Sequence, residues 1–153
     1  LRHFDKILVY PDNYYSNITR RYHKGEVNPR FQLIVLSWQA FVDGYIDPGD
    51  SINLGLHEMA HALRLEHVIR EKPSGMLNDQ LLQQFDAWAE KICANNGEKN
   101  LFFRPYACVN PDEFFSVAVE NFFERPEAFN ENLPELYAIL AELLNQDPLT
   151  LQE

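Results

Sequence analysis

Residues 57–61 read HEMAH, a pattern in which two histidines stand one helical turn apart and a glutamate follows the first. Side chains four positions apart lie on one face of an α-helix, so His57 and His61 can reach one zinc ion together. Glu58 lies beside them and can take a proton from a water molecule activated by that ion. The spacing therefore predicts a zinc centre that performs hydrolysis. The alternative is an amphipathic helix whose histidines pair with acidic residues.

A catalytic zinc site needs a third protein ligand and one open position, and His67 is the first candidate for that ligand. It completes the spacing of the motif H-E-x-x-H-x-x-G-x-x-H, but Arg64 stands where that motif has its glycine. Glycine lets the chain leave the helix, whereas arginine favours its continuation. In a continuous helix His67 would point about 80° away from His57 and lie ~15 Å along the axis. We therefore expect His67 to be a surface histidine.

A carboxylate from the segment 110–124 is the second candidate. Its residues Glu113, Glu120 and Glu124 recur at helical spacing, on the side away from most of its aromatic residues. A buried carboxylate must be paired, capped or bound to a metal. Glu113 is explained equally well as a ligand and as a capping-box residue that returns to the backbone of Asn110. Glu120 is a further candidate ligand, but we favour its accepting a hydrogen bond from a ligand histidine.

The elements that must position these residues follow from the apolar pattern. Residues 6–10 and 31–38 are predicted strands, residues 12–30 are turn-prone with short strand pieces near 18–22, and residues 44–50 form a loop. Helices are predicted over about 51–71, 78–95, 110–124 and 134–146, with Asp50 or Ser51 as the first N-cap. Strands followed by helices indicate an α+β fold. Residues 33–37 either present an edge on which a substrate strand adds or lie inside the sheet.

Composition narrows the class of protein. The length of 153 residues suits one domain, and the hydrophobic fraction of 46% is enough for a buried core. The net charge of −10 argues against binding to nucleic acid or to an anionic membrane surface. No apolar run approaches the ~18–20 residues of a membrane-spanning helix. The chain begins at Leu1 and not at Met, so we expect it to be cropped from a longer protein.

Two local features bear on the compartment. Cys93 and Cys108 form no C-x-x-C pair, so we expect free thiols in a reducing environment. Residues 17–19 match a glycosylation sequon, which we attribute to chance. We accordingly expect a cytoplasmic protein, or the cytoplasmic domain of a membrane-tethered parent, without direct membrane contact.

Several segments together resemble the MtfA (Mlc titration factor A) family of zinc peptidases, over about residues 7–148. They are residues 35–38 (VLSW), 53–61 (NLGLHEMAH), 111–115 (PDEFF), 120–126 (ENFFERP), 134–137 (PELY) and 146–148 (QDP). The catalytic half of that family is similar to the zinc domain of anthrax lethal factor. The resemblance therefore implies a zincin-like fold, in which a small sheet packs with the HExxH helix and further helices follow. The chain departs from the family in two ways: members usually carry Asp near the position of Arg64, and they have a longer N-terminal region of helices that this sequence does not contain.

The resemblance also implies site residues and partners. The family's ligand glutamate corresponds to Glu113 and its catalytic tyrosine to Tyr106, whose hydroxyl would donate to the oxyanion on the peptide carbonyl. It implies Zn²⁺ as cofactor, aminopeptidase-like action on a peptide or protein substrate, and a transcriptional repressor as partner. We therefore predict a metallopeptidase of the gluzincin type with Glu58 as general base. The alternative is a regulatory protein-binding module in which zinc is structural.

Overall fold

The computed structural model describes residues 1–16, 20–46, 52–69, 77–94 and 102–150. Within these ranges all strands precede the α-helices, which confirms the predicted α+β class. The strands are β1 (Lys6–Tyr10), β2 (Tyr14–Ser16), β3 (Arg21–His23), β4 (Gly25–Asn28) and β5 (Leu33–Ser37). The helices are α1 (Trp38–Ile46), α2 (Leu54–Ile69), α3 (Asp79–Ala94), α4 (Pro111–Glu124), α5 (Pro126–Asn132) and α6 (Pro134–Leu144), with short 3₁₀ helices η1 (Pro105–Val109) and η2 (Pro148–Thr150).

β5 is the central strand of a three-stranded sheet. β1 pairs with it in parallel and β4 pairs with it antiparallel, while β2 and β3 form a separate two-stranded sheet. Ile34, Val35 and Leu36 are all buried, because a strand that is apolar on both faces is stable only inside a sheet. The idea that residues 33–37 present an edge to a substrate is therefore wrong. The outer strands are β1 and β4.

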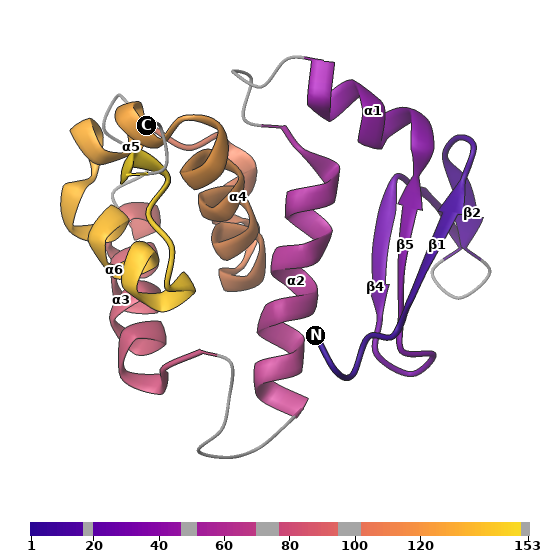
Figure 1. Ribbon diagram of the computed structural model, residues 1–153, viewed down its shortest axis with the longest axis horizontal. Helices are drawn as coiled ribbons and strands as arrows, with labels where there is room; N and C mark the ends of the chain where they lie inside the picture. The colour runs from indigo at the N-terminus through magenta and orange to yellow at the C-terminus, as the bar shows by residue number, and fades with distance from the viewer. Residues whose placement is uncertain (17–19, 47–51, 70–76, 95–101, 151–153) are drawn as a thin grey trace.

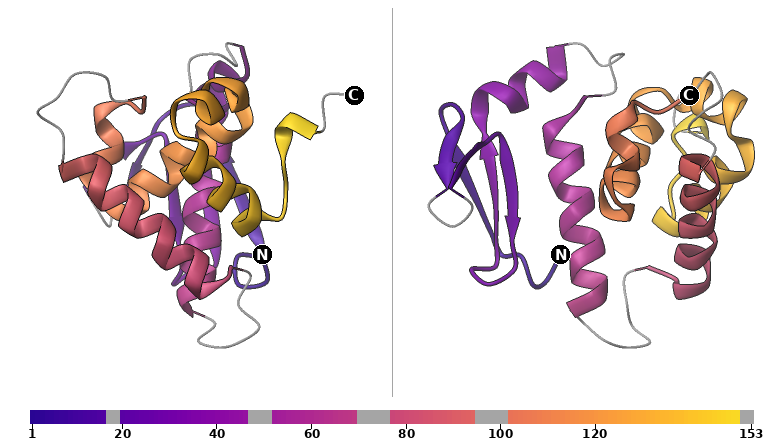
Figure 2. Two further views of the ribbon diagram at one scale, coloured as in Figure 1. Left: turned by 90° about the vertical axis from the view of Figure 1, so that its left-hand side faces the viewer. Right: turned by 180° about the vertical axis from the view of Figure 1, so that it is seen from behind.

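α2 lies between the three-stranded sheet on one side and helices α3 to α6 on the other, as Figures 1 and 2 show from opposite sides. Small residues let it pack closely on both sides. Ala62 joins a core on the side of the sheet with Phe4, Ile34 and Leu36, whereas Ala60 joins the larger core on the other side. Two cores thus fix the position of the helix that carries the HEMAH segment.

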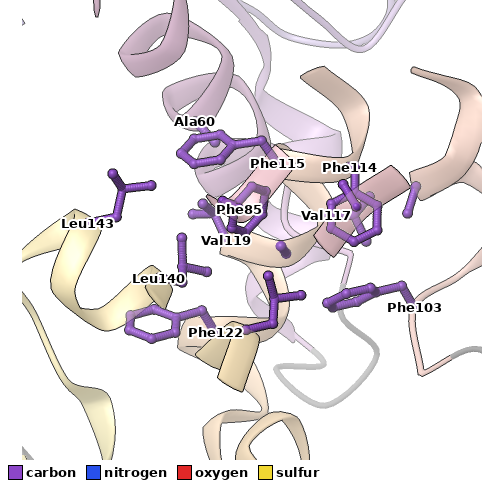
Figure 3. Packing of buried hydrophobic residues seen from close by; sticks show 14 of the residues in the cluster. Ala60, Phe85, Phe103, Phe114, Phe115, Val117, Val119, Phe122, Leu140 and Leu143 are labelled. Carbon is purple, nitrogen blue, oxygen red and sulfur yellow. The ribbon is translucent and has the colours of Figure 1, made fainter. Parts of the chain in front are cut away.

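α4 is buried along most of its length, with nine consecutive residues, 114–122, in the interior. Its phenylalanines fill the space between the helices, and the ring of Phe115 lies 5.4 Å from the ring of Phe85 of α3. Figure 3 shows these two rings beside Ala60 of α2. Because aromatic burial dominates such a core, α4 has a fixed position relative to α2.

The predicted helices are confirmed as α2, α3, α4 and α6, but two helices were missed. Residues 38–46 form α1, which replaces the expected end of the strand at residue 38 and the expected start of a loop at residue 44. The helix begins here because the Ser37 hydroxyl accepts a hydrogen bond from the Ala40 N–H and caps it. α5 begins at Pro126, a residue that suits the first helical position. The proposed caps Asp50 and Ser51, the loop residues 47–49 and the sequon at 17–19 lie outside the described residues. None of the described helices is long and apolar enough to traverse a bilayer.

The expectation of free thiols is wrong, because Cys93 and Cys108 form a disulfide with their Cα atoms 5.5 Å apart. Cys93 lies near the end of α3 and Cys108 in η1, two elements that both pack on α4. No local pattern marks this pair. The tertiary arrangement brings the two sulfur atoms together.

Candidate metal centre

An asparagine fixes the start of the helix that carries the histidines. The side-chain oxygen of Asn53 accepts a hydrogen bond from the Leu56 N–H at 3.1 Å, so it caps α2 just before the HEMAH segment. His57 and His61 follow one turn apart, and their Nε2 atoms lie 3.1 Å from each other. Their ring planes cross at 81°. Both imidazoles therefore point at a common position beside the helix.

Glu113 reaches the same position from the first turn of α4. Its Oε2 atom lies 3.0 Å from Nε2 of His57 and 3.5 Å from Nε2 of His61. Its backbone N–H is capped separately, by the side-chain oxygen of Asn110 at 2.9 Å. The side chain of Glu113 thus faces the histidines, while Asn110 alone supplies the cap.

These three ligand atoms have the spacing of a metal site. A tetrahedral zinc ion about 2.0–2.1 Å from its ligands holds neighbouring ligands about 3.3 Å apart. The Oε2 atom of Glu113 is buried and accepts no well-aligned hydrogen bond from the described residues. A buried oxygen in that state suits a cation. The described residues therefore offer one candidate group of metal ligands, His57, His61 and Glu113.

Charge in the site is consistent with a cation. Although burial acts to lower it, the pKa of His57 is raised to about 9 by the carboxylates of Glu113 and Glu120. Burial acts to raise the pKa of Glu113, but the contacts with His57 and His61 hold that pKa well below its usual range. At neutral pH a proton on His57 balances the carboxylates when no metal is bound. Metal binding would release that proton.

Glu120 supports His57 from behind. Its Oε1 atom lies 2.7 Å from Nδ1 of His57, and its Oε2 atom accepts a hydrogen bond from the Asn53 N–H at 2.8 Å. The carboxylate is only 1% exposed. Arg104 donates to both oxygens, a contact that sequence reasoning missed. The burial of an acidic residue on α4 requires a cationic or hydrogen-bonding partner, but does not identify it.

Glu58, the residue after the first histidine, packs against Gly25 of β4. Burial raises the pKa of Glu58 to about 7, while His57 and His61 act to lower it. A Cβ atom on Gly25 of β4 would lie 2.6 Å from Cδ and 2.7 Å from Cγ of Glu58. Glycine at this position therefore makes room for the Glu58 side chain. Sequence reasoning missed Gly25, because nothing local shows that β4 crosses α2.

Tyr106 stands at the mouth of the site, on η1. Its side chain is 47% exposed, and its ring centroid lies 6.2 Å from that of His57. Partial burial and the neighbouring Glu113 carboxylate raise the pKa of Tyr106 to about 12. The hydroxyl therefore keeps its proton at neutral pH and can donate a hydrogen bond.

A cleft of about 330 Å³ opens beside these residues, a volume within the range of small-ligand sites. Its lining includes His57, Glu58 and Tyr106, together with residues of β4 and α1. His67, the other candidate ligand, lies away from it and pairs through Nε2 with Asp79 at 2.9 Å. Its side chain is only 13% exposed, so the expectation of a surface histidine is wrong.

Comparison with known proteins places this geometry in context. The model of the family described as glucose-regulated metallo-peptidase M90 matches residues 1–144. Mlc titration factor A of Pectobacterium atrosepticum is 30% identical over 164 residues, which are 95% of this chain and 61% of that protein. An uncharacterized protein of Synechocystis sp. is 30% identical over 161 residues, 95% of this chain and 58% of that protein. Mlc titration factor A of Edwardsiella ictaluri is 30% identical over 166 residues, 95% of this chain and 62% of that protein. The chain thus spans between 58% and 62% of the length of these relatives.

Proposed function

Because this chain belongs to the glucose-regulated metallo-peptidase M90 family, we propose that residues 1–153 form a single zincin-like domain that hydrolyses peptide bonds with zinc. His57, His61 and Glu113 hold the ion in this proposal. The main support for this proposed activity is that their three ligand atoms converge beside the buried carboxylate of Glu58. A set of two histidines and one glutamate is typical of catalytic zinc and leaves a fourth position open.

Glu58 handles the protons. When bound, zinc supplies Lewis acidity, which polarises a carbonyl and lowers the pKa of water toward ~7. Glu58 takes a proton from the attacking water and later delivers it to the leaving peptide nitrogen. Its burial and its position next to His57 keep the carboxylate within the cleft for both transfers.

Tyr106 stabilises the charge that develops on the substrate. Its hydroxyl, protonated at neutral pH, donates a hydrogen bond to the oxyanion of the peptide carbonyl. Glu120 acts one step further away, since it accepts from Nδ1 of His57 and so directs Nε2 toward the site.

The substrate lies along β4. This outer strand passes next to Glu58 at Gly25 and borders the cleft, and its outer edge pairs with no other strand of the described ranges, so an extended peptide can add there by main-chain hydrogen bonds. Peptides are therefore the substrate class that this architecture supports. The aminopeptidase action implied by the family resemblance predicts a preference for a free amino terminus.

Metal analysis combined with a peptide assay tests the function. Wild type is expected to bind one zinc ion per chain and to cleave fluorogenic peptides. Glu58→Gln should retain the ion and lose turnover, whereas Glu113→Gln should lose the ion. Substrates with free and acetylated amino termini separate aminopeptidase from endopeptidase action. Peptide cleavage by Glu58→Gln at the wild-type rate would overturn the mechanism.

The second candidate function is binding of a protein partner. Two relatives are named Mlc titration factor A, a name that describes proteins that titrate Mlc. The family resemblance implies a transcriptional repressor as partner, and such a partner would place this chain in the cytoplasm. A purely structural zinc would be closed by a fourth side chain and would not need Glu58. The described residues contribute three ligand atoms, which favours catalysis. Zinc-loaded protein that is inert toward a peptide library would favour the binding function.

A further inference from the structure

Arg104 makes a two-pronged contact with the carboxylate behind the metal ligands. One terminal nitrogen donates to Oε2 of Glu120 at 3.1 Å and the other donates to Oε1 at 2.7 Å. The two planar groups therefore hold each other in one relative orientation. The same Oε1 atom lies 2.7 Å from Nδ1 of His57. A direct chain of contacts thus joins Arg104 to a ligand histidine.

We propose that Arg104 is a positioning residue of the metal centre, which orients the Glu120 carboxylate so that Nε2 of His57 faces His61 and Glu113. This inference rests on the proposed function, because it assumes that these three residues bind zinc. Arg104 does not touch the ion in this arrangement. It acts through Glu120 and His57.

The geometry explains why Glu120 needs this partner. A buried carboxylate has several acceptor positions and could rotate between them if few were filled. The Asn53 N–H holds Oε2 on one side, and the planar fork of Arg104 fixes both oxygens at once. With the carboxylate plane fixed, Oε1 meets the Nδ1–H of His57 and sets both its tautomer and its ring orientation.

Arg104 also lies next to the tyrosine at the mouth of the site. Its guanidinium carbon is 5.9 Å from the centroid of the Tyr106 ring, and both residues line the cleft. The residue is placed between two groups of the centre, the carboxylate that directs His57 and the ring of Tyr106. An arginine whose only task was to neutralise Glu120 would not require the two-pronged geometry.

The test measures zinc affinity, by competition with a chromogenic chelator, in wild type and in Arg104→Met. Loss of a residue that supports a metal ligand typically weakens affinity by about 10- to 100-fold, and we expect a loss in that range. Arg104→Lys keeps the charge without the fork, so its affinity should lie between those of wild type and Arg104→Met. Cobalt-substituted protein should show an altered visible spectrum in Arg104→Met, because the ligand geometry changes.

Arg125 provides a matched control. It is also partly buried, donates through Nε to Asn121 at 3.1 Å, and stacks over the ring of Phe102 at 4.6 Å, so its contacts go to these residues and not to Glu120. Arg125→Met should therefore keep wild-type zinc affinity, whatever its effect on the unfolding temperature. Equal losses of affinity in Arg125→Met and Arg104→Met would show general loosening of the fold and overturn the proposal.

A double-mutant cycle isolates the route through Glu120. Glu120→Gln should weaken zinc binding, and adding Arg104→Met to it should cost little more affinity. Fully additive losses, or wild-type affinity in Arg104→Met or Arg104→Lys, would refute the positioning role and leave the metal centre standing. Wild type that binds no zinc, or Glu113→Gln that binds it as tightly as wild type, would instead refute the proposed function itself.

Discussion

Opening the disulfide between Cys93 and Cys108 is expected to lower the free energy of unfolding by about 3 kcal/mol. The bond joins residues 15 positions apart. Closing a loop of that length removes roughly 10 cal/mol/K of entropy from the unfolded chain, which corresponds to about 3 kcal/mol at room temperature. For a chain of this size the loss should lower the unfolding temperature by about 6–12 °C. The urea midpoint should fall by about 1.5 M if the slope is ~2 kcal/mol/M.

Urea titrations followed by tryptophan fluorescence measure this effect. Wild type is compared with and without a phosphine reductant, in the presence of a chelator, so that metal binding does not contribute to stability. The double variant Cys93→Ala/Cys108→Ala is the matched control. It should unfold near the midpoint of reduced wild type and should not respond to the reductant.

Two results would refute the reasoning. Native wild type that reacts with two equivalents of a thiol reagent per chain, before any unfolding, does not contain the bond. A reductant that cleaves the bond without moving the urea midpoint would show that the loop adds no constraint to the unfolded chain. Only the first result would also restore the expectation of free thiols.

Three further outcomes follow from the structure. Gly25→Ala should lower kcat by up to about 100-fold with zinc content unchanged, because the new methyl group displaces Glu58; wild-type kcat would contradict this. The Tyr137 hydroxyl donates to Asp147 at 2.7 Å, and burial together with that carboxylate raises the pKa of Tyr137 above its ordinary 10.0. The folded chain therefore holds a proton that the unfolded chain loses, so stability should be full below pH 10 and fall above it. Tyr137→Phe should unfold with a shallower alkaline slope, measured by urea titrations at several pH values, and an unchanged slope would count against the assignment. Zinc at a concentration one hundred times its dissociation constant should raise the free energy of unfolding by about 2.7 kcal/mol. Calorimetric unfolding scans at increasing zinc concentration measure this rise, and its absence would count against a metal site in the native state.

Local signals account for the helices that carry the site. The spacing of His57 and His61 places both rings on one face of α2 through helix geometry alone. Asn110 and the proline after it mark the start of α4, and the structure places the side-chain oxygen of Asn110 on the N–H of Glu113. Such signals act over three or four residues, so they can be recognised without knowing what packs nearby. The same is true of the Ser37 cap of α1, a signal that is present in the sequence within a segment whose apolar pattern predicts a strand.

The sequence by itself thus determined the HEMAH face, the order of strands and helices, and the acidic stripe of α4. Only the tertiary structure decided which strand borders the cleft, which residue holds Glu120, and that the two cysteines meet. The physical reason is distance along the chain: Asn53 contacts Glu120 across 67 positions, and Gly25 meets Glu58 only because β4 pairs with β5 next to α2. Contacts of this kind form when packed cores fix whole elements against each other, and no short stretch of sequence records them.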